Sequence, residues 1–294
     1  MNIKRVTTGI SLGLLVLLSI IKGGWLLTAV VFLFVSLASK EYVTILKHKG
    51  FLPSFGIMMT ATVTLTFLAY FNKFSLVAPA FSLLSILALM WVLFRGSQPY
   101  IANAATTILG FVYCAWFPLH LLFLRNLPSY HGGCDGLLSN ICNSGLGYVI
   151  LLFFVVIMTD TGCYFFGTRF GKHKLAPVIS PHKTWEGAIG GGLSAVAVSM
   201  IIGWLIGFEW YHSLFTGIII TTFAQIGDLC ESMIKRDAGV KDSGDTLPGH
   251  GGFLDRTDSY ILTTPILFYY FKYVVLTGIL NVDIINFFRS FFHV

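Results

Sequence analysis

The chain alternates between long apolar runs and short polar segments. Runs with almost no charged residue occupy residues 6–21, 23–39, 51–72, 74–94, 96–124, 146–159, 187–208, 211–227 and 259–271. A helix needs roughly 20 residues to cross the hydrocarbon core of a bilayer, and many of these runs approach that length. The pattern therefore predicts an all-α, polytopic integral membrane protein with about nine transmembrane helices.

Composition and charge support this prediction. Of the 294 residues, 55% are hydrophobic and 11% charged, and the mean hydropathy is +0.80, well above that of a water-soluble domain. If the N-terminus faces the cytoplasm and nine helices span the membrane, 14 of the 19 Lys and Arg residues lie on the cytoplasmic side, in accord with the positive-inside rule. The net charge of +6 thus reflects topology and does not indicate a nucleic-acid partner.

The two halves of the chain differ in kind. Residues 1–145 carry few reactive groups and are expected to form a transmembrane scaffold that could contact a second copy of the chain, whereas residues 146–294 form the catalytic transmembrane region. The start, Lys4-Arg5 and an apolar run, is also typical of a secretory signal, but apolar sequence continues to Ser39, which favours a retained helix. Cys134 and Cys142 share a segment expected outside the cytoplasm. There they could form a disulfide or remain as two free thiols, and the sequence leaves both alternatives open.

Acidic and basic side chains concentrate in residues 225–258. This stretch holds seven of the thirteen acids and four bases, namely Asp228, Glu231, Asp237, Asp242, Asp245, Asp255, Asp258, Lys235, Arg236, Lys241 and Arg256. Gly249, Gly251 and Gly252 surround His250 and leave little side-chain bulk, so backbone N–H groups could approach a phosphate closely. Cation and anion binders interleaved beside such a turn predict a metal-assisted phosphate site.

Helical spacing is expected to bring carboxylates of this stretch together. Asp228, Glu231 and Lys235 share one stripe of a helix that enters from an apolar run. Asp255 and Asp258 share a face at the start of the last helix. Two helix ends would then present their carboxylates to each other. Mg²⁺ takes oxygen ligands and usually retains waters and substrate phosphates, so two or three carboxylates without a Cys/His set fit it.

Asp160, further upstream, ends an apolar run. An ionisable group at membrane depth is costly and therefore a candidate for function, although a structural pair with Arg169 is the alternative. Tyr164 lies one helical turn further on, so one face could present both groups inward. The sequence Gly167-Thr-Arg-Phe-Gly171-Lys172 resembles a P-loop, but it has three residues between the glycines instead of four, and His173 replaces the required Ser or Thr, which excludes that motif.

The next polar segment reads Ser180-Pro-His-Lys-Thr-Trp-Glu-Gly187. Lys183, Thr184 and Glu186 offer a phosphate donor, a hydroxyl and a carboxylate, and the alternative is a plain polar loop that caps the next helix. Small residues follow at four-residue spacing, which lets transmembrane helices approach closely. These pairs are Gly187 and Gly191, Gly190 and Ser194, and Gly203 and Gly207.

One contiguous block combines most of these features. Residues 232–258 read Ser232-x-Ile-Lys-Arg-x4-Lys-Asp-x-Gly-x2-Leu-Pro-x-His-Gly-Gly-Phe-x-Asp-Arg-Thr-Asp258. This block resembles the signature of the phosphatidate cytidylyltransferases, the CDP-diacylglycerol synthases. The segments 160–167 and 180–187 look like companion motifs of that family. The resemblance covers about 155–265 closely, whereas residues 1–145 match only as apolar spans.

The resemblance implies a transferase that converts CTP and phosphatidate to CDP-diacylglycerol and pyrophosphate in phospholipid biosynthesis. It implies Mg²⁺, with a second cation left open, a homodimer, and an active site at the cytoplasmic face of a bacterial cytoplasmic membrane. The roles that it implies are catalytic for Asp228, Lys183, Lys235, Arg236, Lys241, Asp255 and Arg256; metal-binding for Asp228, Asp255, Asp258 and Glu231; and substrate-binding for Asp160, Tyr164, Ser180, Thr184, Glu186, Asp242, His250, Gly251 and Gly252.

Two other classes of protein compete with this interpretation. A lipid or polyprenol kinase that uses CTP would share a membrane fold, a metal and a cytosolic phosphate site. A transporter or channel would also place charges within spans, but it has no need for an acid- and glycine-rich loop of 31 residues, 228–258. Residue chemistry does not separate nucleotidyl from phosphoryl transfer.

Overall fold

The computed structural model describes residues 3–130, 145–246 and 251–278, with the backbone alone for residues 3–8 and 10. Most of this is helical. The helices are α1 (Ile3–Lys22), α2 (Gly24–His48), α3 (Phe55–Tyr70), the turn η1 (Phe74–Leu76), α4 (Val77–Arg95), α5 (Tyr100–Gly110), the π-helical η2 (Phe111–Trp116), α6 (Phe117–Arg125), α8 (Leu146–Phe170), α9 (Trp185–Leu205), α10 (Trp210–Asp237), α11 (Leu254–Tyr270) and the π-helical η4 (Phe271–Val275). Cys134, Cys142, Gly249 and His250 lie outside the described residues.

The prediction of a polytopic helical membrane protein is confirmed. Within the described ranges, six helical stretches are long and apolar enough to cross a membrane, namely Gly24–His48, Phe74–Arg95, Tyr100–Arg125, Leu146–Phe170, Trp185–Leu205 and Trp210–Asp237. The count of nine is not confirmed. Helix α3 has only 16 residues, fewer than a typical span, and α11, which continues into η4, carries Asp255, Arg256 and Asp258 in its first turns.

A two-stranded antiparallel hairpin departs from the all-helical expectation. Strand β1 (Lys174–Ala176) pairs with β2 (Ser180–Thr184), in a segment for which the sequence predicts no strand. Pro181 is compatible with β2 because both strands of such a hairpin are edge strands, where a missing N–H is tolerated. The hairpin places Lys183 directly before α9.

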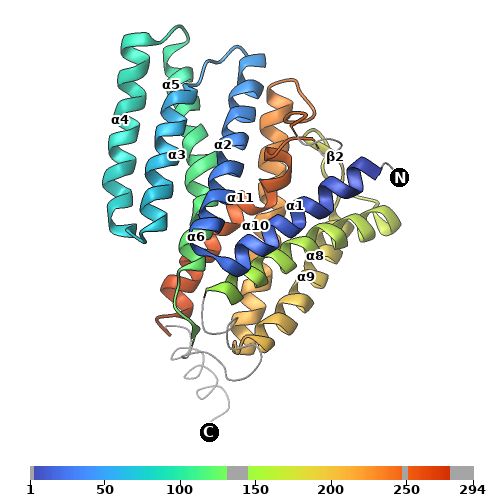
Figure 1. Cartoon of the computed structure of the whole chain (residues 1–294). Coiled ribbons are helices and arrows are strands. Elements are labelled where there is room, and N and C mark those ends of the chain that lie inside the picture. Colours follow the sequence, from blue (N-terminus) through green and yellow to red (C-terminus); the bar gives the residue numbers. More distant parts are fainter. Residues whose placement is uncertain (1–2, 131–144, 247–250, 279–294) are drawn as a thin grey trace, which may run out of the picture.

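The helices are arranged around a shared interior (Figure 1). In this view α3, α4 and α5 lie on one side, α8 and α9 lie on the other, and α2, α6, α10 and α11 lie between them. The largest fully buried side chains come from several of these elements and include Tyr42, Phe111, Phe123, Leu151 and Phe268. The last described helix, α11, is therefore part of the core.

Small residues bring α8 and α9 into close contact, as their spacing predicts. A Cβ atom on Gly162 would lie 2.8 Å from the Cα of Gly191, and one on Gly187 would lie 2.8 Å from the Cys163 carbonyl oxygen. The prediction for Gly207 is wrong. Its φ of +80° places it in the turn after α9, where no neighbour lies within 4 Å of an added Cβ, so it serves the turn and not a helix contact.

Contacts join the two regions of the chain, 1–145 and 146–294. The Thr264 hydroxyl of α11 donates a 2.8 Å hydrogen bond to the Phe117 carbonyl at the start of α6. His120 of α6 is fully buried, donates from Nδ1 to the Trp116 carbonyl at 2.9 Å, and has Nε2 3.3 Å from the Tyr269 hydroxyl. His120 is thus a satisfied core histidine, as expected for a histidine within an apolar run.

Candidate active site

A polar cleft of about 590 Å³ opens between α8, the hairpin, α9 and α10. Asp160, Tyr164, Lys183, Thr184 and Asp228 are among its lining residues. Asp160 and Tyr164 therefore point into the same space, as their spacing on one helix predicts. The close packing of α8 and α9 brings Asp160 toward Lys183 of the hairpin, although the two residues are 23 positions apart in the sequence.

Lys183 and Asp228 form an ion pair in this cleft. Their Nζ and Oδ2 atoms lie 2.5 Å apart, and both side chains are partly exposed. Lys183 comes from β2, and Asp228 lies on α10 one residue after Gly227. A Cβ on Gly227 would lie 2.5 Å from the Asp258 carbonyl oxygen, so this glycine lets α10 approach the first turns of α11. The predicted approach of the two helices is thus present, but Asp228 lies within α10, nine residues before its last residue Asp237, and not at the end of that helix.

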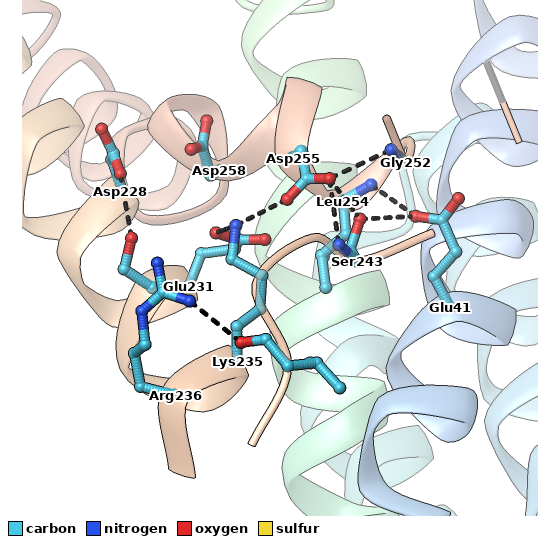
Figure 2. Close-up of polar contacts among 12 residues, drawn as sticks. Glu41, Asp228, Glu231, Lys235, Arg236, Ser243, Gly252, Leu254, Asp255 and Asp258 are labelled. Atoms are coloured by element: carbon cyan, nitrogen blue, oxygen red, sulfur yellow. Dashed lines mark hydrogen bonds and ion pairs between the residues drawn. The ribbon is translucent and has the colours of Figure 1, made fainter. Parts of the chain in front are cut away.

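Three carboxylates share the field of Lys183. The negative charges of Asp160, Asp228 and Asp258 repel one another, and the positive charge of Lys183 attracts both Asp160 and Asp258. Figure 2 shows Asp228 and Asp258 next to each other. A single lysine does not neutralise three carboxylates, so this donor set suits a hard divalent cation.

Among the described residues, no three Asp, Glu, His or Cys side chains form a preformed metal-binding group.

Asp255 occupies a different position from Asp228 and Asp258. Its Oδ1 accepts from the buried Lys235 ammonium at 2.6 Å, and Lys235 is also 2.5 Å from Glu231 (Figure 2). Its Oδ2 accepts from the Ser243 N–H at 3.1 Å, the Ser243 hydroxyl at 2.8 Å and the Gly252 N–H at 3.0 Å. Both oxygens are therefore occupied, and Asp255 fastens the loop between α10 and α11.

The hydrogen bonds of Asp255 also set its ionisation. Asp255 lies in the first turn of α11, ahead of the apolar stretch that starts at Ser259. Burial alone would raise its pKa, but hydrogen bonds from Glu231, Lys235 and the Gly252 N–H lower the pKa overall, below the usual carboxyl range. Asp255 is thus held as a carboxylate. The side chains of Glu231 and Lys235 point toward Asp255 and do not line the polar cleft.

The remaining basic candidates and Asp242 lie at the end of α10, in the loop after it and in the first turn of α11. Arg236 is exposed and donates to the Ile179 carbonyl at 3.4 Å and the Val240 carbonyl at 3.1 Å, so it ties the end of α10 to the hairpin turn. Lys241, Asp242 and Arg256 are exposed. Unlike Lys183, none of these four lines the polar cleft described above.

The glycines of the loop have a structural use that the sequence interpretation did not include. Gly251 has a φ of +77°, which favours glycine. A Cβ on Gly252 would overlap the Ser243 hydroxyl and lie 2.5 Å from a carboxylate oxygen of Glu41. The Gly252 N–H, expected to be open to a phosphate, is bound by Asp255. Because Gly252 has no side chain, the Ser243 hydroxyl and the Glu41 carboxylate fit beside its backbone.

The hairpin and the start of α9 hold two further candidates in structural contacts. Thr184 is buried and caps α9, since its hydroxyl accepts from the Gly187 N–H at 3.2 Å. The Glu186 carboxylate accepts from the Lys172 N–H at 3.0 Å and binds His173 Nδ1 at 2.6 Å, which closes the turn after α8. Ser180 begins β2. Thr184 thus fits the alternative interpretation of this segment, a polar loop that caps the next helix, and it also lines the polar cleft.

Glu41 on α2 is the main polar residue that sequence reasoning missed. It is 6% exposed and contacts the loop between α10 and α11. One signal was available, because Glu41 is the sole acidic residue in the first 134 positions. An acid alone in an apolar half needs a polar partner.

Comparison with known proteins gives the family. A model of the Cytidylyltransferase family matches residues 3–274. A Synechocystis protein named phosphatidate cytidylyltransferase is 33% identical over 276 residues, covering 89% of this chain and 93% of the relative. The Arabidopsis thaliana protein named phosphatidate cytidylyltransferase 4, chloroplastic, is 34% identical and covers 92% of this chain and 73% of the relative. A Staphylococcus haemolyticus phosphatidate cytidylyltransferase is 51% identical over 128 residues, 42% of this chain and 49% of the relative.

The chain therefore belongs to the cytidylyltransferase family, which confirms the resemblance. It is an enzyme and an integral membrane protein.

Proposed function

We propose that this enzyme transfers CMP from CTP to phosphatidate, which gives CDP-diacylglycerol and pyrophosphate. The observation that carries the proposal is the cleft in which Lys183 pairs with Asp228 beside Asp160. In the reaction, an oxygen of the lipid phosphate bonds to the α-phosphorus of CTP, and the α–β anhydride bond breaks. The lipid phosphate is already ionised, so little proton transfer is needed.

The polar cleft is the proposed site of the CTP phosphates. Lys174, His182 and Lys183 line it and offer positive charge or hydrogen-bond donors. Lys183 is the clamp that the geometry favours, since a phosphate can replace Asp228 as its partner once a cation takes the carboxylate. Arg236, Lys241 and Arg256 do not line the cleft and are proposed as outer phosphate contacts because they are exposed at the end of α10, in the loop after it and in the first turn of α11.

Asp228 and Asp258 are the proposed cation ligands, with Asp160 beside them. Mg²⁺ held there would neutralise charge that gathers on phosphate oxygens during transfer. Asp255 and Glu231, also expected to be ligands, can serve only if Lys235 leaves its position between them. A second cation is part of the proposal only in that case.

A separate apolar groove suits the lipid. It measures about 540 Å³ and is lined by α1, α2, α6, α8 and α11, with residues such as Val16, Phe34 and Phe153. Arg256 and Thr257 also line it. We propose that acyl chains of phosphatidate lie in this groove and that the lipid phosphate lies near Arg256, whose planar guanidinium suits phosphate.

The products test the reaction type against a CTP-using kinase. Purified enzyme in detergent should receive phosphatidate, Mg²⁺ and CTP labelled separately at the α- and γ-phosphate. We expect α-label in the lipid and γ-label in pyrophosphate, because attack occurs at the α-phosphorus, and diacylglycerol should be inert as acceptor. γ-Label in the lipid fraction, or turnover with diacylglycerol, would contradict the proposal in favour of the kinase.

The site is proposed to face the cytoplasm of a bacterial cytoplasmic membrane, because an arrangement with a cytoplasmic N-terminus and nine spans would place 14 of the 19 Lys and Arg residues on that side. A reporter inserted within 241–247 should be cytoplasmic, and one within 131–143 should be outside. Accessibility labelling in intact cells measures both. Finding both reporters on one face would contradict the nine-span arrangement. The homodimer stays a proposal that rests on the family resemblance.

A further inference from the structure

Glu41 holds the start of α11 from the other half of the chain. Its Oε1 accepts from the Phe253 N–H at 3.0 Å and the Thr246 hydroxyl at 2.6 Å. Its Oε2 accepts from the Leu254 N–H at 2.9 Å. The Ser243 hydroxyl lies 3.2 Å from the same oxygen and 2.8 Å from Asp255, and it can donate to one of them at a time.

These contacts satisfy groups that have no local partner. The first N–H groups of a helix lack intrahelical acceptors, and α11 has no side-chain cap of its own at Phe253. Glu41 supplies that cap from α2, 212 residues away along the chain. A buried carboxylate without donors would be very costly, so Glu41 and the helix end stabilise each other. A negative charge at a helix N-terminus also suits the helix dipole.

The contacts also reach the residues of the reaction. Ser243 links Glu41 to Asp255, and Asp255 binds Lys235 on α10. The helix that Glu41 caps carries Arg256 and Asp258, three and five residues after Phe253. The rotation of α11 about its axis and the distance of α11 from α10 therefore depend on where the first turn of α11 is held.

We infer that Glu41 is a positioning residue for nucleotide transfer, which acts by fixing the α10–α11 loop and the first turn of α11. Glu41 lies outside the polar cleft and its carboxylate is filled by protein donors, so it does not touch substrate. The inference rests on the proposed placement of CTP phosphates and a cation against this part of the molecule.

Glu41→Gln tests the inference, since the amide keeps the volume but puts two N–H donors where only acceptors fit. We expect kcat/KM for CTP to fall roughly 10- to 100-fold, as for loss of a group that orients catalytic ligands. Hydrogen exchange should rise in a peptide that contains Phe253 and Leu254. Glu41→Asp should recover part of the rate. Glu209→Gln, at an exposed glutamate before α10, is the matched control and should behave like the parent.

A double-variant cycle separates positioning from general destabilisation. Thr246→Ala removes a hydroxyl that binds Glu41 and should lower kcat/KM for CTP several-fold. Combined with Glu41→Gln, it should add little, because both changes remove the same contact. Full additivity would overturn the inference. If Glu41→Gln does not insert, Thr246→Ala alone carries the test, and parental kinetics for it would overturn the inference.

The kinetic and exchange measurements distinguish this inference from the proposed function. Faster exchange with parental kcat and KM for Glu41→Gln would mean that Glu41 only fastens the helix, and it would overturn the inference while leaving the proposed function intact. Parental kinetics for Lys183→Ala would contradict the proposed CTP placement and, because the inference rests on that placement, would overturn the inference as well.

Discussion

Asp228→Asn should lower turnover roughly 10²- to 10³-fold, which is the size of effect seen when one group that stabilises transition-state charge is removed. The amide keeps the shape but removes the charge that pairs with Lys183 at 2.5 Å and that faces Asp258. A hard cation also binds an amide less strongly than a carboxylate. Initial rates of CDP-diacylglycerol formation over a Mg²⁺ titration measure the loss.

Asp237→Asn is the matched control on the same helix. Asp237 is exposed and pairs with Lys49 at 2.9 Å, and exposed pairs contribute only about 0–1 kcal/mol. Its turnover should stay close to the parental value. If Asp228→Asn also kept the parental rate at saturating Mg²⁺, Asp228 would not be a ligand of the cation.

Asp255→Asn should lower both turnover and stability. The change leaves the buried Lys235 with Glu231 as its remaining carboxylate partner and turns amide hydrogens toward the Ser243 and Gly252 donors. Removal of one partner from a buried ion pair typically costs 3–5 kcal/mol, and because Glu231 remains we expect about 3 kcal/mol. Thermal unfolding in detergent, measured beside turnover, checks both effects.

The pH dependence of stability gives a second measurement for the same variant. Hydrogen bonds lower the folded-state pKa of Asp255, so its contribution is fully present above the ordinary carboxyl pKa of about 3.9 and is lost as pH falls through the lower folded-state value. Parent and Asp255→Asn should therefore converge in strongly acidic solution. A variant that unfolds like the parent at pH 7 but has lost turnover would show that Asp255 acts as a ligand and not as an anchor.

The sequence predicted what depends on local spacing. The apolar runs gave the helical membrane fold, and the four-residue spacing of Gly187 and Gly191 gave the close contact of α8 with α9. The placement of Asp160 and Tyr164 in one cleft followed from helical periodicity. Each of these follows from backbone geometry over a few residues, which a sequence displays directly.

Long-range pairing was not predictable in this way. Asp228 and Asp255 look equivalent in the sequence, since each is an acid near a helix end. They differ because Lys235 and Ser243 reach Asp255, whereas Lys183 comes from a hairpin to meet Asp228. Which donor pairs with which carboxylate depends on the donor that lies closest after the helices have packed. The spacing of residues along the chain does not encode these distances.

The capping of α11 by Glu41 has a consequence for how the protein is made. Phe253, which binds Glu41, leaves the ribosome 212 residues after it, a delay on the order of 10–40 s at typical synthesis rates. Until Ser243 and Thr246 emerge, 202 and 205 residues after it, the Glu41 carboxylate has none of its final partners and must stay hydrated at the membrane surface or be held by the insertion machinery. The arrival of α11 thus completes both the proposed active site and the burial of Glu41. Chains truncated before α11 would leave the Glu41 carboxylate without its two backbone donors, the N–H groups of Phe253 and Leu254.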